Sequence, residues 1–203
     1  MIDSDGRSTS WLEHPSFFPG VVSTLIVGHA FDLVGTYAYQ PNFEHEVNPI
    51  YITLKPYGLT LSWPKVIAAK TVYCVLTVCA LVFALRKRRR YYPDSTGSFR
   101  ESFTHFLYGR PITWSETLYR SPKSFVPTLL FVFIAISFSG FYGAYLGYDN
   151  LAAKYGWPSL GGFYIGRYWI DYCNLFILPA SVVFTVVLLW DDIRFSQCSS
   201  NSG

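Results

Sequence analysis

The chain has 203 residues, of which 51% are hydrophobic, 19% aromatic and only 14% charged, and its formal net charge is +3. An ordinary soluble domain contains about 25% charged residues. The composition therefore excludes a disordered chain, a coiled coil and a nucleic-acid-binding module, and it is typical of a membrane protein.

Four apolar stretches are long enough to cross a bilayer, which needs about 20 residues. The first contains His29 and Asp32, the second contains Lys65 and Lys70, and the fourth contains Asp171. The third has no charged residue. The sequence therefore predicts an all-α membrane bundle with four transmembrane helices, at about residues 17–39, 63–85, 125–148 and 168–190.

Lysine and arginine residues are concentrated between the second and third spans, in the loop at residues 86–124. The positive-inside rule places this loop in the cytoplasm, together with both termini, residues 1–16 and 191–203. The C-terminal segment is polar and is expected to be flexible. The basic run at residues 86–90 directly follows a span, so we interpret it as a topology anchor that also contacts anionic lipid, and not as a nucleic-acid site.

A short helix is predicted inside this loop. Ser98 and Glu101 have the spacing of a capping box, and Gly109 follows where a helix would end. A second box pairs Thr113 with Glu116. One face of the helix is apolar, and it either lies in the inner membrane interface or packs on neighbouring helices; this face carries Phe99, Phe103, Phe106 and Leu107.

Ionisable residues inside a bilayer are costly and are functional candidates by default. At about 1.5 Å of helix rise per residue, Asp32 and Lys70 both lie about 10 Å below the outer boundary of the membrane. Because their spans are consecutive and antiparallel, the sequence predicts a buried ion pair. His29 lies one turn below Asp32 on the same face, and Arg167 can pair with Asp171 four residues later.

These polar groups gather in the outer half of the predicted bundle. They form either a pocket that binds a ligand or an ion or transfers protons, or a set of structural pairs that fix helix register. In the first case Asp32 is the candidate acid, base or ion ligand, and Lys70 is its charge partner. The predicted pocket comprises His29, Asp32, Thr36, Glu46, Asn48, Lys70, Arg167, Asp171 and Asn174.

No metal site and no cofactor is predicted. The available ligand types are His29, Asp32, His45 and Glu46, but the paired motifs of di-iron bundles and zinc proteases do not occur in the sequence. A lone intramembrane histidine can also ligate a pigment, so His29 is kept as a candidate for that role.

The third span carries a stripe of small residues. Ser139, Gly143 and Gly147 follow one another at a spacing of four, which lets helix backbones approach closely. The stripe packs either on other spans of the same chain or on a partner protein.

Two short motifs carry a resemblance to a known family. Asp32 is followed four residues later by Thr36, and Glu46-x-Asn48-Pro49 precedes the next span, in which Lys70 lies early. In this pattern the chain resembles small multi-pass membrane proteins of bacteria and archaea that have no assigned function. The likeness covers about residues 20–85 and implies that Asp32, Glu46 and Asn48 act together. A long loop before the second span departs from the pattern.

The sequence favours a non-catalytic integral membrane subunit or assembly factor of a larger membrane complex. The alternatives are a small membrane enzyme or transporter that uses Asp32 and Lys70, and a pigment-binding subunit that uses His29. The expected partners are the lipid bilayer and other membrane proteins, and the expected location is the inner membrane of a bacterium or an archaeon.

Overall fold

The computed structural model describes the backbone of most of the chain. The described residues are 10–43, 55–58, 60–93, 97–113, 115–123, 125–160, 162–165 and 168–200. At residues 55, 127, 162–165, 168–174 and 197–200 only the backbone is described.

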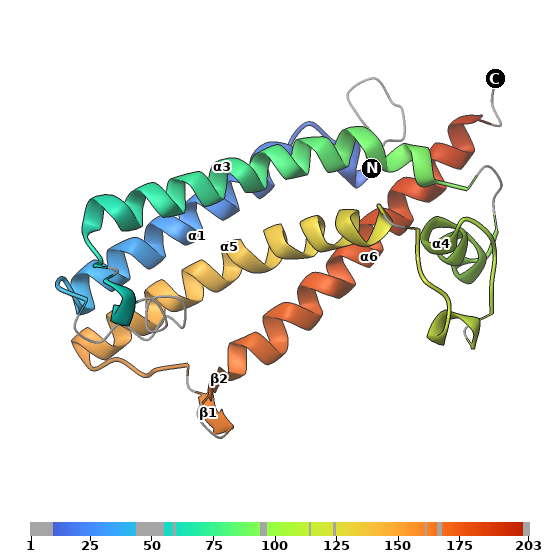
Figure 1. The fold of residues 1–203 in the computed structure, drawn as a ribbon. Coiled ribbons are helices and arrows are strands. Elements are labelled where there is room, and N and C mark those ends of the chain that lie inside the picture. The colour runs from blue at the N-terminus through green and yellow to red at the C-terminus, as the bar shows by residue number, and fades with distance from the viewer. Residues whose placement is uncertain are drawn as a thin grey trace. The chain divides into compact units, whose positions relative to one another are not determined.

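Helices make up most of the described residues (Figure 1). The long helices are α1 (Phe17–Tyr39), α3 (Trp63–Lys87), α5 (Val126–Tyr155) and α6 (Tyr172–Ser200). The short helix α4 (Phe99–Tyr108) lies between α3 and α5 in the sequence. Single 3-10 turns are η1 (Trp11–Glu13), η2 (Lys55–Tyr57), η3 (Arg88–Tyr91) and η4 (Glu116–Leu118).

Each long helix contains a stretch that is long and apolar enough to cross a membrane. These stretches are Phe17–Tyr39, Trp63–Tyr91, Thr128–Tyr155 and Leu175–Ser196, the second of which includes η3 after α3. The predicted all-α fold with four candidate spans and a short helix between the second and third is confirmed. The chain is therefore an integral membrane protein in its architecture.

A hairpin precedes the last long helix and shifts the start of the fourth span. The sequence predicts this span from residue 168, but β1 (Gly162–Ile165) and β2 (Tyr168–Asp171) form an antiparallel pair there. Both strands are rich in aromatic and β-branched residues, which favour extended backbone. The helix consequently begins only at Tyr172.

Both predicted tails contain ordered structure. The helix α6 continues through Ser200, although a flexible tail is predicted from residue 191. Asp192 and Ile193 explain the extension, because both are buried and hold the end of the helix in place. In the N-terminal segment, η1 buries Leu12 in the hydrophobic core.

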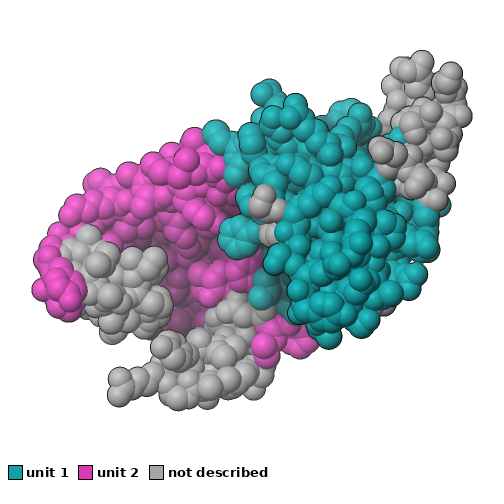
Figure 2. Space-filling model, turned by 45° about the vertical axis from the view of Figure 1, so that its right-hand side comes forward, with its two compact units in different colours: residues 1–22, 78–137, 178–203 teal, residues 23–77, 138–177 magenta. Residues whose placement is uncertain are grey.

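The chain divides into two compact units (Figure 2). The first comprises residues 1–22, 78–137 and 178–203, and the second comprises residues 23–77 and 138–177. The first unit holds the main hydrophobic core, to which η1, α3, α4, α5 and α6 all contribute. Its buried residues are Leu12, Leu81, Ala84, Tyr92, Phe106, Val126, Leu129, Phe133, Ile136, Leu188, Leu189 and Ile193.

The ends of α4 are built as the sequence predicts. The Ser98 hydroxyl accepts the Glu101 N–H and the Glu101 carboxylate accepts the Ser98 N–H, which completes the capping box. The helix ends at Gly109, whose φ of 79° is a left-handed conformation that glycine adopts without strain. Thr113 and Glu116 form the second predicted box in the same way. The backbone N–H of Ser98 lowers the pKa of Glu101, and that of Thr113 lowers the pKa of Glu116.

The apolar face of α4 packs on neighbouring helices. Phe106 is fully buried in the core of the first unit. Phe99 lies edge-to-face on Trp190 of α6, with ring centroids 5.1 Å apart. Of the two predicted environments, these contacts support helix packing.

Replacing Ser98 by alanine removes the cap of α4. We expect a loss of about 1 kcal/mol of stability, because the Glu101 N–H loses its acceptor. The measurement is the melting temperature of the purified protein in detergent. Ser98→Thr keeps the hydroxyl and is the control; equal melting temperatures for the alanine and threonine variants would show that the cap contributes nothing.

Candidate functional site

In the second unit, α1 and α5 approach each other closely along their glycines. A Cβ atom at Gly143 would lie 2.9 Å from the carbonyl oxygen of Gly28, and one at Gly147 would lie 2.5 Å from that of Phe31. No side chain fits at such distances. The stripe predicted on residues 139–147 therefore packs against α1 of the same chain. The close approach also brings the polar side chains of α1 within reach of α5.

His29 on α1 contacts both α3 and α5. Its Nε2 lies 2.8 Å from Ser139 Oγ on α5, and the Tyr73 hydroxyl of α3 donates to the same oxygen at 3.0 Å. Its Nδ1 lies 3.3 Å from Lys70 Nζ. An ammonium group only donates, so Nδ1 is the acceptor and a neutral ring carries its proton on Nε2. His29 therefore donates to Ser139.

The predicted ion pair between Lys70 and Asp32 is present. Asp32 is buried, whereas the Lys70 side chain keeps 30% of its surface exposed. The Thr36 hydroxyl donates to Asp32 Oδ1 at 3.3 Å, and the Asn150 amide of α5 donates to Thr36 at 3.1 Å. The carboxylate is thus compensated by a charged and a neutral donor, as a buried charge requires.

These contacts connect three spans through one hydrogen-bonded series, which we call the intramembrane polar network. It joins α1 to α3 through Lys70 and to α5 through Ser139 and Asn150. It also holds a carboxylate, an ammonium and an imidazole next to one another, a combination that can bind an ion or move a proton. In order, its members are Tyr73, Ser139, His29, Lys70, Asp32, Thr36 and Asn150.

The structure brings together only part of the predicted pocket, namely His29, Asp32, Thr36 and Lys70. For Asp171 and Asn174 the backbone alone is described. The other predicted residues lie outside the described residues: His45, Glu46, Asn48 and Arg167.

Three members of the network were not predicted as polar partners. Ser139 was assigned to helix packing, and its hydroxyl also accepts a hydrogen bond from His29. Asn150 continues the same stripe three residues after Gly147, and Tyr73 follows Lys70 by three residues on α3. Asn150 and Tyr73 could therefore have been predicted, because residues three apart on a helix lie on the same face as the residue already identified.

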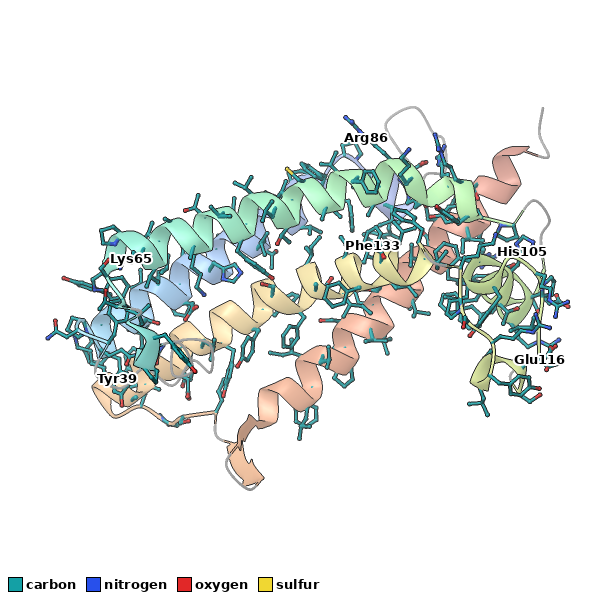
Figure 3. All side chains as sticks on the ribbon, in the orientation of Figure 1. Tyr39, Lys65, Arg86, His105, Glu116 and Phe133 are labelled. Carbon is teal, nitrogen blue, oxygen red and sulfur yellow. The ribbon has the colours of Figure 1, made fainter. Side chains whose placement is uncertain are left out.

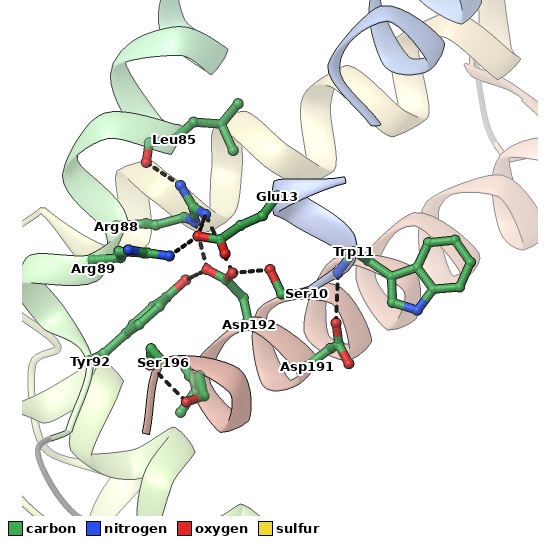
Figure 4. Close-up of polar contacts among 11 residues, drawn as sticks. Ser10, Trp11, Glu13, Leu85, Arg88, Arg89, Tyr92, Asp191, Asp192 and Ser196 are labelled. Carbon is green, nitrogen blue, oxygen red and sulfur yellow. Dashed lines mark hydrogen bonds and ion pairs between the residues drawn. The ribbon is translucent and has the colours of Figure 1, made fainter. Parts of the chain in front are cut away.

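A second polar cluster lies in the first unit, and the sequence does not predict it (Figure 4). Asp192 of α6 is 1% exposed and accepts hydrogen bonds from Arg88, Tyr92 and Ser10. Arg88 contributes two of them, from Nε at 2.6 Å and from Nη2 at 3.3 Å. We call Ser10, Glu13, Arg88, Tyr92 and Asp192 the Asp192 cluster.

The Asp192 cluster attaches the N-terminal segment to two helices. Glu13 pairs with Arg88 at 3.5 Å and also contacts Arg89. The Trp11 N–H donates to the neighbouring carboxylate of Asp191 at 2.8 Å. The 3-10 turn η1 is therefore bonded to η3, which directly follows α3, and to α6.

The Tyr92 hydroxyl gives the Asp192 cluster a defined pH dependence. Burial raises the pKa of Tyr92, and the adjacent Asp192 carboxylate raises it further. The folded protein holds this proton more tightly than the unfolded chain does. The resulting stability is complete below about pH 10, the ordinary tyrosine value, and is lost as the pH rises above it.

Tyr92→Phe is expected to flatten the loss of stability at alkaline pH. The wild type should lose melting temperature more steeply than the variant between about pH 9.5 and 11, because only its unfolded state gains by ionising residue 92. Melting curves in detergent across this range test the difference. Parallel curves would contradict the pKa assignment.

Comparison with protein-family models, curated proteins and solved structures finds no match to this chain. Among the described residues, no three His, Cys, Asp or Glu side chains come together in a group that could hold a metal ion. The geometry of the intramembrane polar network is thus the main guide to function.

Proposed function

We propose that the chain is a non-catalytic integral membrane subunit or assembly factor of a larger membrane protein complex. The observation that supports this is the intramembrane polar network, in which Asp32 and Lys70 are bonded to each other and to further side chains of the same three spans. Buried ion pairs are well suited to fix register. In this role the charges hold the helices together and present their apolar outer faces to lipid and protein partners.

The resemblance to small prokaryotic membrane proteins supports a location in the inner membrane of a bacterium or an archaeon. The basic loop after α3 supports an orientation with both termini in the cytoplasm. The Asp32–Lys70 pair then lies in the outer half of the bundle.

Mild extraction from native membranes tests the proposal. We expect a particle heavier than the chain itself, with the same protein partners in repeated preparations. Asp32→Asn should lower the amount of the chain in the membrane and of its partners in the particle together. A clean single chain that accounts for the protein's activity would contradict the proposal.

A small membrane enzyme or transporter is the second candidate, and the exposure of Lys70 favours it. The Lys70 side chain keeps 30% of its surface exposed beside the buried Asp32 carboxylate, and ionisable groups inside a membrane are functional candidates. In this role Asp32 is the acid, base or ion ligand, Lys70 is its charge partner, and His29, Glu46 and Asp171 are auxiliary. Pigment binding through His29 has less support, because both ring nitrogens are already engaged, by Ser139 and by Lys70.

Proton flux into vesicles that contain the purified protein tests the second candidate. If the network moves protons, Lys70→Gln should abolish a flux that the wild type supports, since the charge beside Asp32 is lost. Lys65→Gln is the matched control, because Lys65 lies on the same helix but bonds to Thr60. A wild-type protein without flux, or equal flux in both variants, would exclude this role.

A further inference from the structure

In the structure, the basic run at residues 86–90 consists of one buried residue, Arg88, and four residues that reach the surface. Arg88 is buried and bonded to Asp192, so it is not available to a ligand. The neighbouring basic residues remain at the surface: Arg86, Arg89 and Arg90 are exposed, and Lys87 is half-buried.

Helix geometry directs two of these side chains away from the protein. Arg86 stands two residues before Arg88 on the last turn of α3, and two α-helical residues turn a side chain by about 200°. Arg90 stands two residues after Arg88 on the 3-10 turn η3, where two residues turn a side chain by about 240°. Neither side chain therefore lies on the side of the buried Arg88. Figure 3 shows Arg86 extending away from α3. Within the described part of the chain, neither Arg86 nor Arg90 has an acidic partner, whereas Arg89 contacts Glu13.

Aromatic rings accompany the cations at the same helix ends. Lys87 Nζ lies 5.8 Å from the centroid of the Phe83 ring on α3. The Arg194 guanidinium lies 5.9 Å from that of Trp190 on α6. A tryptophan ring beside an arginine is typical of the headgroup level of a membrane, where the ring contacts the lipid and the cation reaches the phosphates.

We propose that Arg86 and Arg90 form a binding surface for the phosphate groups of anionic phospholipids. Guanidinium groups bind phosphate oxygens with two parallel hydrogen bonds, which a lysine cannot do. The Arg88–Asp192 pair anchors the residue between the two arginines in the protein, while Arg86 and Arg90 stay at the surface. The surface uses no residue of the intramembrane polar network and is independent of the proposed function.

Native mass spectrometry of the full chain tests the proposal. The protein is exchanged into a mild detergent that contains equal amounts of phosphatidylglycerol and phosphatidylcholine, and the bound lipids are counted. We expect the wild type to retain phosphatidylglycerol preferentially. The variant R86Q/R90Q should bind it about fivefold more weakly for each charge removed. The variant R110Q/R120Q removes the same charge beside Glu116 and is the control.

The outcomes separate a lipid surface from other phosphate ligands. A selective loss in R86Q/R90Q, with an unchanged melting temperature and no competition by inorganic phosphate, supports the proposal. Equal loss in both double variants overturns it, because net charge alone would then explain binding. Displacement of the lipid by millimolar inorganic phosphate overturns it as well, since the surface would then recognise a soluble phosphate.

Discussion

Replacing Asp192 by asparagine is expected to destabilise the first unit by about 3–5 kcal/mol, because it leaves the buried Arg88 without its closer charged partner and only with the longer contact to Glu13. The carboxylate also accepts hydrogen bonds from Tyr92 and Ser10, and an amide cannot satisfy all of these donors. We expect a large fall in melting temperature in detergent and a loss of protein from the membrane.

The adjacent residue provides a matched control for this substitution. Asp191 is the same residue type on the same helical turn, but its bond to the Trp11 N–H is at an exposed position. Asp191→Asn should therefore cost much less. The double variant R88M/D192L replaces the pair by apolar side chains and should recover part of the stability, although the Tyr92 and Ser10 hydroxyls still lose their acceptor. Equal effects at residues 191 and 192 would contradict a buried charge pair.

Gly28→Ala is expected to separate α1 from α5 and to destabilise the protein by about 2–3 kcal/mol. The added Cβ would lie in direct conflict with the backbone of Gly140, and a helix backbone yields less readily than a flexible side chain. Thermal unfolding in detergent measures the loss. The same substitution should weaken the His29–Ser139 contact, which depends on the close approach of these helices.

Gly20→Ala is the control for helix propensity on the same helix. A Cβ at Gly20 would meet no atom within 4 Å, so alanine should leave stability unchanged or raise it by about 0.5–1 kcal/mol. Equal melting temperatures for Gly28→Ala and Gly20→Ala would contradict a role of Gly28 in the close packing of α1 on α5.

Hydropathy, depth and capping patterns predicted much of the fold. The four spans follow from the long apolar stretches, and the Asp32–Lys70 pair follows from matching depths on consecutive antiparallel helices. The capping box at Ser98 depends only on residues three apart in sequence. Each of these features depends only on neighbouring residues or on position along a helix axis. The sequence therefore contains enough information to predict it.

Features that depend on helix rotation were not predictable in the same way. The sequence presents the basic run as one membrane-surface anchor, and only the rotation of the helical turn η3 decides that Arg88 is the residue that faces Asp192. That bond joins residues 104 positions apart in the sequence. Likewise, the small size of Ser139 indicated packing, but its hydrogen bond depends on the orientation of His29 on another helix.

The strongest test of a structural role for the intramembrane polar network is to replace its charged pair by apolar residues. We would compare D32L/K70M with D32L, measuring the amount of the chain in native membranes and the proteins that remain with it after mild extraction. We predict that D32L is lost, because Lys70 is left unpaired, while D32L/K70M accumulates and keeps the partners of the wild type. A double variant that accumulates but has lost these partners would contradict a purely structural role for the charges.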